Sequence, residues 1–387
     1  MSHVGGRITL LQSEEFRGET MMIGYISLGD PRRRGTWSGT PHSIFQRLSR
    51  DHQVEWINPG GLNTKTIYRY HKVIGKLTGR TVRPYSTLRF ASAVGRNLSK
   101  HDLSRYDLLF SIGSTEIANL DTTVPIVHLT DATFAQMVGY YDGFDMGEKR
   151  NRHANEIQRK AYEASTQIIF ASAWAARSAM NDYHVPEEKI NVVRFGANQD
   201  VPDRLPERQG DGMLRMLFVG KEWVRKGGSI AVDALTSLQD RGIDAELVMV
   251  GCDPPKGVPN MKGLTIIPYV EDVSIYFREA DIFILPTRAE CAGIVFCEAS
   301  AYGLPSFTTA TGGVPDYVED GVTGRLLPPD ARGEDFADAI AELWSDPEAM
   351  KEMRLNARRR YEEELNWDVW TKRFEEIAEK ALTASKA

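Results

Sequence analysis

Short runs of hydrophobic residues alternate along this chain with longer stretches in which apolar positions recur at a helical period. This alternation predicts an α/β fold with parallel strands covered by helices on both faces of the sheet. The expected strands of the first half are Met22–Leu28, Val54–Ile57, Leu108–Ile112, Ile126–Leu129, Ile168–Ala171 and Asn191–Arg194. Those of the second half are Leu214–Val219, Ala245–Val250, Leu264–Ile267, Ile282–Leu285 and Ser306–Thr308.

The stretch Gly196–Asp211 separates the two sets of strands, because it carries two prolines and several charges but no apolar periodicity. We therefore expect a domain boundary near residue 205, with doubly wound, Rossmann-like domains at 1–205 and 206–367 and a cleft between them. Ligands of such sheets bind outside the carboxyl ends of the strands. After Pro347 the pattern is helical to the end, and a final helix at about 368–387 is expected to cross back to the first domain.

The composition fits this picture, since 387 residues exceed one ordinary core and suit two domains. The three cysteines, Cys252, Cys291 and Cys297, form no Cys-x-x-Cys pair, which favours reduced, buried thiols over disulfides or structural zinc. Neither a signal peptide nor an apolar run long enough to span a membrane is present, so the expected location is the cytoplasm.

The net charge of −6 is unevenly distributed, because residues 1–205 carry +5 and the remainder carries −11. The segment 56–101 contains nine lysines and arginines, several aromatic residues and no acidic residue. Such a run is either a solvated helical face or a surface that docks on an anionic membrane or on an acidic or lipid-diphosphate acceptor. Nucleic acid is not an expected partner, because the overall balance is acidic and no nucleic-acid motif occurs.

A candidate phosphate site lies in the segment 281–301. A predicted strand ends at Pro286, a loop carries Glu290 and Gly293, and a predicted helix begins near Ile294 and stops before Gly303. Gly293 allows the backbone to approach a ligand closely, and the free N–H groups of a helix start bind anions. A diphosphate fits this arrangement.

Two carboxylates flank that phosphate site. Glu298, on the first turns of the helix, is placed to accept hydrogen bonds from vicinal hydroxyls such as those of a ribose. Glu290, in the loop, is placed to face a sugar on the other side of the phosphates. The alternative is that both residues only favour the helix N-terminus electrostatically.

A second loop, Gly220–Gly227, follows a predicted strand and precedes a predicted helix. Lys226, together with Lys221 or Arg225, is expected to project over the same cleft as Gly293. Two cations offset the charges of a leaving nucleotide diphosphate. The alternative is a solvated basic loop.

These segments, with residues 311–316 (Thr-Gly-Gly-Val-Pro-Asp) and 320–324 (Asp-Gly-Val-Thr-Gly), resemble the motifs of the retaining GT-B glycosyltransferases of family 4, the glycosyl transferases group 1. The Glu290 to Glu298 pair resembles the Glu-x7-Glu motif of that family. The resemblance covers most of the second half and is weaker in the first half, where it rests on Gly39 and the run 172–198. Lys221 stands where an arginine is usual, and Cys291-Ala292 replace a frequent Gly-Phe.

The resemblance implies transfer of a hexose, with retention, from a UDP- or GDP-sugar held by the second domain to a hydroxyl of a glycan, glycolipid or lipid-linked acceptor on the first. It implies catalytic roles for Glu290, Lys226, His128 and Asp131, with His128 at the end of a strand that faces the cleft, although a structural histidine is the alternative. Glu290 is either a binding residue or a covalent nucleophile. The implied donor-binding residues are Gly39, Lys221, Arg225, Lys226, Tyr269, Val270, Glu290, Ala292, Gly293, Ile294, Val295 and Glu298.

Neither a metal nor a cofactor is expected. The chain has no Asp-x-Asp pair, no Gly-x-Gly-x-x-Gly before a helix and no Gly-Lys-Ser or Gly-Lys-Thr phosphate loop. Two other functions remain open: a nucleotide-sugar 2-epimerase of the same fold, and a non-catalytic subunit that binds sugar nucleotides. The partners expected are a nucleotide-diphosphate sugar, the acceptor and an anionic membrane surface at the inner face.

Overall fold

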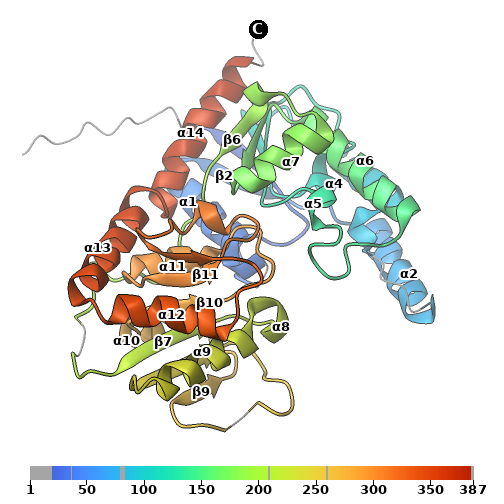
Figure 1. Ribbon diagram of the computed structural model, residues 1–387. Coiled ribbons are helices and arrows are strands. Elements are labelled where there is room, and N and C mark those ends of the chain that lie inside the picture. Colours follow the sequence, from blue (N-terminus) through green and yellow to red (C-terminus); the bar gives the residue numbers. More distant parts are fainter. Residues whose placement is uncertain (1–19, 36, 79–82, 208–209, 259, 385–387) are drawn as a thin grey trace, which may run out of the picture.

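The computed structural model describes residues 20–35, 37–78, 83–207, 210–258 and 260–384. It consists of two α/β halves, each built on a six-stranded parallel sheet. Figure 1 shows the halves as two lobes joined along one side by the long C-terminal helices. Arg80, one of the cations of the basic segment 56–101, lies outside the described residues.

The first half contains a sheet with the strand order β2-β1-β3-β4-β5-β6. The strands are β1 (Met22–Ile26), β2 (Gln53–Ile57), β3 (Leu108–Ser111), β4 (Ile126–Thr130), β5 (Gln167–Phe170) and β6 (Ile190–Val192). Its helices are α1 (Thr40–Asp51), α2 (Leu62–Thr78), α3 (Leu88–Leu98), α4 (Ser114–Ile117), α5 (Phe134–Met137), α6 (Glu148–Ala164) and α7 (Ala173–Tyr183), with short 3-10 turns η1 (Trp37–Gly39), η2 (Pro84–Ser86) and η3 (Glu187–Lys189).

The second half contains a sheet with the order β12-β11-β10-β7-β8-β9. The strands are β7 (Leu214–Val219), β8 (Ala245–Val250), β9 (Leu264–Ile267), β10 (Ile282–Leu285), β11 (Ser306–Thr309) and β12 (Gly324–Leu327). The helices are α8 (Trp223–Lys226), α9 (Gly228–Asp240), α10 (Ser274–Glu279), α11 (Ile294–Ala301), α12 (Gly333–Trp344) and α13 (Pro347–Glu363), with the 3-10 turn η4 (Val314–Asp316); α14 (Trp367–Ala384) follows.

The predicted α/β fold with two Rossmann-like sheets is confirmed, and each expected strand is present within a few residues of its predicted ends. The sequence did not reveal β12, because this edge strand begins with a glycine and an arginine. Gly324 is required there: a Cβ atom at this position would lie 2.0 Å from the carbonyl oxygen of Ser306 on β11. The predicted boundary near residue 205 falls between β6 and β7.

The C-terminal region contains α13 and α14, and α14 begins within a residue of the expected start at about 368. The chain breaks between α13 and α14, where Asn366 starts a new helix by accepting hydrogen bonds from the backbone N–H groups of Asp368 (3.0 Å) and Val369 (2.9 Å). The break redirects the chain. Helix α13 packs on α11 of the second half, while α14 packs on α1 of the first.

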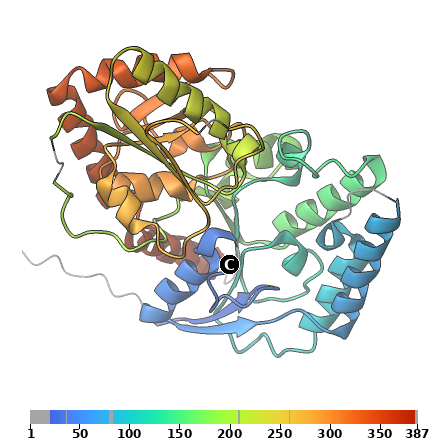
Figure 2. The same cartoon turned by 90° about the horizontal axis from the view of Figure 1, so that it is seen from below.

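Aromatic packing fixes α14 on the first half. The rings of Trp370 and Phe374 stack on each other at 5.5 Å, and both meet Phe110 of β3 edge to face. The predicted crossing of the final helix back to the first domain is therefore present in the structure, and Figure 2 shows α14 lying against the first half from the second viewpoint.

A buried tyrosine ties the two sheets together. The hydroxyl of Tyr317, just after η4, donates to the carbonyl of Ala171 (2.8 Å) and accepts from the backbone N–H of Phe195 (3.2 Å). Its partners follow β5 and β6, at the edge of the first sheet that faces the second. The carboxyl ends of the two sheets are therefore held opposite each other.

Candidate active site

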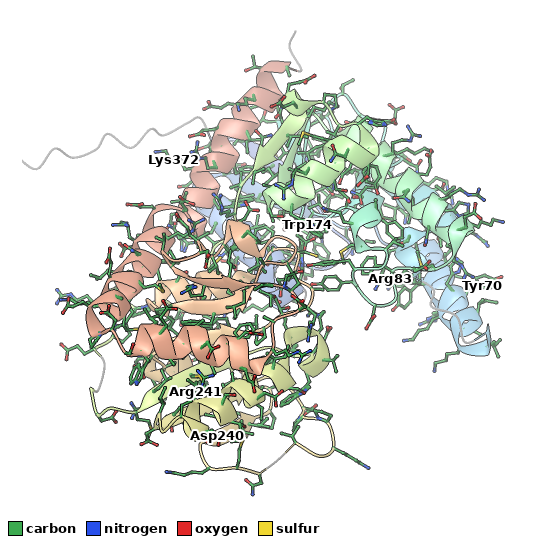
Figure 3. The ribbon with its side chains drawn as sticks, viewed as in Figure 1. Tyr70, Arg83, Trp174, Asp240, Arg241 and Lys372 are labelled. Atoms are coloured by element: carbon green, nitrogen blue, oxygen red, sulfur yellow. The ribbon has the colours of Figure 1, made fainter. Side chains whose placement is uncertain are left out.

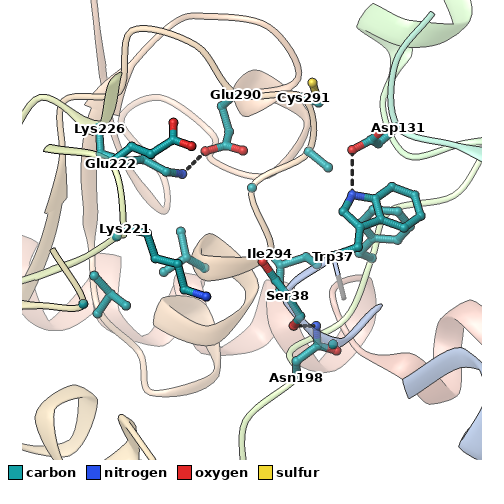
Figure 4. Close-up of a pocket in the computed structure, with 18 of the residues that line it drawn as sticks. Trp37, Ser38, Asp131, Asn198, Lys221, Glu222, Lys226, Glu290, Cys291 and Ile294 are labelled. Atoms are coloured by element: carbon teal, nitrogen blue, oxygen red, sulfur yellow. Dashed lines mark hydrogen bonds and ion pairs between the residues drawn. The ribbon is translucent and has the colours of Figure 1, made fainter. Parts of the chain in front are cut away.

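A cavity of about 820 Å³ lies between the two halves, where the loops that follow β1, β4, β7, β8, β9 and β10 meet. Figure 4 shows it in close-up. Of the residues predicted from sequence, those that line it are Gly39, Asp131, Lys221, Arg225, Lys226, Tyr269, Val270, Glu290, Ala292, Gly293, Ile294, Val295 and Glu298. The structure thus brings these residues into one site at the expected edge of both sheets.

His128 is not among the lining residues, and the expectation that it ends a strand at the cleft is wrong. It lies in the middle of β4, because the strand continues to Thr130. Its fully buried ring contacts the carbonyl of Ser111 through Nδ1 (3.2 Å) and the hydroxyl of Ser114 through Nε2 (3.2 Å). Burial lowers the pKa of His128 to about 4, so the ring is neutral.

The start of α11 forms one wall of the cavity. Gly293 precedes it with φ 84°, and no side chain caps the helix. A Cβ atom at Gly293 would lie 2.6 Å from the ring of Phe296, so a larger residue would strain both the backbone and the packing. The open end of the helix therefore presents backbone N–H groups and partial positive charge to the cavity.

Lys226 and Glu290 form an ion pair beside that helix start (Figure 4). Both side chains are largely buried, with 9% of each residue exposed. Lys226 is the last residue of α8, and Glu290 belongs to the loop after β10. The sequence predicted that both would reach the cleft, but their direct contact is a finding of the structure.

Arg225 is the second cation near Glu290. Its Nη1 lies 3.7 Å from the carboxylate of Glu290 and donates to the carbonyl of Ala289 (2.8 Å) and the hydroxyl of Tyr141 (3.2 Å). Its Nε pairs with Glu222 at the rim of the cavity. Arg225 and Lys226 thus flank one carboxylate and hold it in a fixed position.

Glu298 projects from the second turn of α11 into the cavity, and its side chain is buried. Burial raises the pKa of Glu298 to about 8, while a hydrogen bond from the backbone N–H of Asn198 acts in the opposite direction. In the unliganded protein this carboxyl is therefore largely protonated at neutral pH. A ligand that donates hydrogen bonds to it favours the ionised form.

The first half contributes a strained turn that sequence reasoning found only at Gly39. Gly39 has φ 89° and precedes α1, and the two residues before it, Trp37 and Ser38, also have positive φ (49° and 52°). Asn198 donates to the carbonyl of Ser38 (2.8 Å) and accepts from Trp367 of α14 (3.0 Å). Asn198 ends the run 172–198 that resembles the family, but no role was predicted for it from the sequence, and the structure shows that it joins this turn to the final helix.

Asp131 and Trp37 form a further pair in the cavity (Figure 4). The indole Nε1 of Trp37 donates to Asp131 at 3.1 Å. The pKa of Asp131 is raised to about 6, chiefly by burial; the hydrogen bond from Trp37 opposes this shift, and the negative charge of Glu290 adds to it. Two carboxylates, Asp131 and Glu290, therefore face the same cavity from opposite halves.

Lys221 and Tyr269 lie at the mouth of the cavity, where the ammonium group of Lys221 lies 5.3 Å from the centre of the Tyr269 ring. Tyr269 follows β9 and is largely exposed. A planar ring beside a cation suits contact with another flat group.

Sequence reasoning missed the loop between α5 and α6. The hydroxyl of Tyr140 accepts from the backbone N–H of Glu290 (2.9 Å) and bonds the hydroxyl of Thr311 (2.9 Å). Tyr141 reaches the carbonyl of Ala289 (3.3 Å). This loop of the first half thus holds the Glu290 loop of the second, and two adjacent tyrosines in a loop carry no signature that would have predicted it.

The structure also bears on metals, membranes and thiols. Among the residues it describes, no group of three or more His, Cys, Asp or Glu side chains is placed to hold a metal ion. Within that same part of the chain, no helix has both the length and the apolar character needed to cross a membrane. The three cysteines are buried, as expected, and none of them forms a disulfide.

Comparison with known proteins gives one match to a family and several to single proteins. The sequence model of the family glycosyl transferases group 1 matches residues 214–346. A GDP-mannose-dependent α-(1-6)-phosphatidylinositol monomannoside mannosyltransferase of Mycolicibacterium smegmatis is 30% identical over 359 residues, which cover 85% of this chain and 90% of the relative. A D-inositol 3-phosphate glycosyltransferase of Arthrobacter is 27% identical, and that match spans 64% of this chain but only 65% of the relative, just under two thirds of its length.

Solved structures share the fold. Sucrose-phosphate synthase from Thermosynechococcus elongatus superposes with a TM-score of 0.68 at 15% identity, over 94% of this chain and 100% of the other. WaaG, a glycosyltransferase involved in lipopolysaccharide biosynthesis, superposes with a TM-score of 0.63 at 18% identity, over 93% and 98%. Together with the near full-length match to the mannosyltransferase, these findings show that the chain belongs to the GT-B glycosyltransferases known as glycosyl transferases group 1.

Proposed function

We propose that this protein is a retaining glycosyltransferase that moves a hexose from a UDP- or GDP-sugar to a hydroxyl of a glycan, glycolipid or lipid-linked acceptor. The observation that carries the proposal is the convergence of Lys226, Glu290, Gly293 and Glu298 on one cavity between the carboxyl ends of two sheets. That set combines cations, an uncapped helix start and two carboxylates, which suits a diphosphate linked to two polyhydroxyl groups.

The names of similar proteins support the class of donor. The mycobacterial relative is described as GDP-mannose-dependent, and a structure of Anabaena HepE with the same fold contains UDP-glucose. Both donors contain a ribose, a diphosphate and a hexose in sequence, and the proposed contacts in the cavity match these three groups. The acceptors named for the relatives are an inositol phosphate and a phosphatidylinositol monomannoside, which supports a polyhydroxyl or lipid-linked acceptor.

In the proposal the second half, residues 206–367, holds the donor. Glu298 accepts from the ribose hydroxyls, and Arg225, Lys226 and the start of α11 face the diphosphate. Tyr269, Val270 and Lys221 at the mouth contact the base end of the donor. The first half, residues 1–205 with α14, holds the acceptor, and Gly39 allows its backbone to approach the diphosphate from the opposite side.

The proposed reaction replaces one bond at the anomeric carbon. The bond to the diphosphate oxygen breaks, the acceptor oxygen bonds to the same face of the sugar, and the acceptor proton passes to the leaving phosphate. Lys226 and the start of α11 stabilise the negative charge that develops on the leaving group, so the proposal includes neither a metal ion nor another cofactor. Glu290, held by Lys226 and Arg225, binds the donor sugar, and Asp131 lies across the cavity on the acceptor side.

The proposal also includes peripheral docking on an anionic membrane at the cytoplasmic face through α2. Three large apolar side chains of this helix are exposed on one face: Tyr70 (55%), Val73 (54%) and Leu77 (78%). Lysines and arginines flank them on the same helix, at Lys65, Arg69, Lys72 and Lys76. An exposed apolar row bordered by cations is typical of a helix that lies on an anionic bilayer.

The test is incubation of the purified protein with radiolabelled UDP- and GDP-sugars, with and without candidate acceptors. We expect slow donor hydrolysis with at least one donor, and a large loss of it in Glu298→Ala and in Lys226→Ala. Unchanged hydrolysis in both variants would exclude this site. Conversion of the donor to its 2-epimer would instead identify an epimerase, and calorimetric donor binding without any turnover would identify a non-catalytic subunit.

A further inference from the structure

A second groove, of about 540 Å³, lies in the first half. It is formed by the middle of α2 and by the starts of α3 and α6, three elements far apart in the sequence. The residues that line it are Tyr70, His71, Thr87, Leu88, Arg89, Met146, Gly147, Glu148, Lys149, Arg150 and His153. None of them lines the cavity between the two halves, so this groove is a separate site.

The groove is strongly positive. Arg89, Lys149 and Arg150 form no ion pair with any residue in the part of the chain that the structure describes. Glu148 is the one acidic residue in the lining, and its carboxylate pairs with Arg152, 3.1 Å away. Three cations are thus brought together without a matching anion from these residues.

Both arginines line the groove together with His71. The pKa of His71 is lowered by its partial burial and then by the positive charges of Arg150 and Arg89. Like charges that line one groove repel each other, and an anion bound in the groove offsets that repulsion. Guanidinium groups match the oxygens of a phosphate with paired, charge-assisted hydrogen bonds.

The groove also borders an apolar surface. Tyr70 lines it and begins the exposed row that continues along α2 with Val73 and Leu77. Figure 3 shows Tyr70 at the outer edge of the first half, on the helix that projects farthest from the second half. A ligand that fills the groove with a phosphate therefore has an apolar surface next to it.

We propose that this groove binds the phosphate headgroup of an anionic phospholipid, with Arg89 and Arg150 on the phosphate oxygens and the lipid chains beside the apolar row of α2. This inference rests on the proposed docking of α2 on a membrane and adds to it a specific headgroup site. The alternative is nonspecific attraction, in which the charge of the bilayer attracts the basic segment and no single groove is required. A headgroup site predicts that Arg89 and Arg150 contribute more to binding than cations of the first half that lie outside the groove.

The test uses the whole protein and compares two double variants that each remove two positive charges. Arg89→Ser with Arg150→Ser empties the groove of its arginines. Arg96→Ser with Lys100→Ser is the matched control, because Arg96 lies two turns further along α3 and Lys100 follows that helix, both outside the groove. Binding is measured by calorimetry with dihexanoyl phosphatidylglycerol below its micellar concentration, and with inorganic phosphate.

We expect the groove variant to bind the short lipid at least about tenfold more weakly than the wild type, and the control variant to bind within about twofold. Equal losses in the two variants would overturn the headgroup site. Inorganic phosphate bound as tightly as the lipid would overturn the lipid assignment and leave free phosphate as the ligand. Circular dichroism and thermal unfolding confirm that each variant is folded.

The same variants separate this inference from the proposed enzyme activity. Arg89 and Arg150 do not line the donor cavity, so donor hydrolysis is expected to be unchanged in the groove variant. Lost lipid binding with intact hydrolysis supports the headgroup site. Intact lipid binding in that variant contradicts it, whether or not the protein hydrolyses any donor.

Discussion

Lys226 and Glu290 form a buried ion pair at the wall of the cavity, although they are 64 residues apart and belong to α8 and to the loop after β10. Replacement of Lys226 by alanine leaves Arg225, 3.7 Å away, as the remaining cation beside Glu290. We expect a loss of about 2 kcal/mol in the free energy of unfolding, because a buried charge loses its main partner. Donor hydrolysis should fall by about two orders of magnitude.

Urea denaturation and initial hydrolysis rates measure these two effects. Lys221→Ala is the control, since Lys221 lines the same cavity but lies over the ring of Tyr269. Addition of Glu290→Ala to the Lys226 variant should restore part of the stability but none of the activity. An equal loss of stability in the Lys221 and Lys226 variants would contradict the role of the ion pair.

Donor binding should depend on pH through Glu298. Burial raises the pKa of this carboxyl to about 8, and hydroxyl groups of a ribose donate to its ionised form. The affinity for UDP-glucose or GDP-mannose should therefore increase as the pH rises toward 8, by up to about tenfold per unit, and level off above it. Calorimetry from pH 6.5 to 8.5 measures this, and neither donor has a phosphate that titrates in that range.

Glu298→Gln should bind the donor weakly and without this pH dependence. Glu222→Gln is the matched control, because Glu222 also lines the cavity but pairs with Arg225 at the rim. A wild-type affinity that is flat from pH 6.5 to 8.5 would exclude the ribose contact.

The same carboxyl also predicts how stability changes with pH in the absence of ligand. The pKa of Glu298 is raised from 4.5 to about 8, so between these values the folded protein holds a proton that the unfolded chain has lost. The free energy of unfolding should therefore fall as the pH rises through this window. Urea denaturation of Glu298→Gln across the same range should show a smaller decrease, and an identical slope would argue against a buried, protonated Glu298.

Gly293→Ala tests the helix start. Alanine is strained at φ 84°, and its Cβ would lie 2.6 Å from the ring of Phe296. We expect a loss of about 1–3 kcal/mol in stability together with weaker donor binding. Gly242→Ala is the control for backbone strain alone, because Gly242 has φ 81° and no atom within 4 Å of the added carbon. Equal donor affinity in the two variants would show that the start of α11 does not hold the diphosphate.

Trp37→Phe tests the Asp131 carboxylate. The indole donates to Asp131 and lowers its pKa, which burial has raised to about 6, so loss of this hydrogen bond should raise that pKa further. If ionised Asp131 assists transfer, the acidic limb of the pH–activity profile moves to higher pH by about one unit. Asp131→Asn should remove that limb and most of the activity. An unmoved limb in Trp37→Phe would assign it to another group.

Membrane docking through α2 should depend on both charge and salt. Vesicles of equal parts phosphatidylcholine and phosphatidylglycerol should sediment the protein at low salt and release it at high salt, because surface charge is screened over about 10 Å at 0.1 M. Leu77→Ser, which removes the most exposed apolar side chain of this row, should weaken sedimentation without affecting donor hydrolysis. Equal sedimentation with pure phosphatidylcholine would rule out an electrostatic surface.

Much of the cavity wall formed by the start of α11 could be predicted from the sequence, because its residues are close together in the chain. Gly293, Glu298 and the helix that joins them lie within a few residues of each other, so their spacing sets their geometry once α11 forms. The ends of strands can be predicted because the apolar pattern changes there. Lys226 and Glu290 each follow such an end, so both were expected at the same edge of one sheet. A strand that begins with Gly324 and Arg325 has no such pattern, and β12 was missed for that reason.

The contacts that the site residues make with distant parts of the chain could not be predicted from the sequence. His128 was expected to end its strand, but β4 runs two residues beyond it, and the ring is buried against Ser111. The contact between Tyr140 and the backbone of Glu290 joins residues 150 positions apart and depends on how one half lies against the other.

The sequence by itself therefore determined the strands, the helices and the kinds of group at the carboxyl ends of the sheets, because hydrophobic periodicity and glycine conformations act over a few residues. Only the tertiary structure decided which charges neutralise each other, as in Lys226 with Glu290, and which carboxyls are buried, as with Glu298. Those outcomes depend on distances between segments far apart in the sequence, and such distances are set by packing across the whole core.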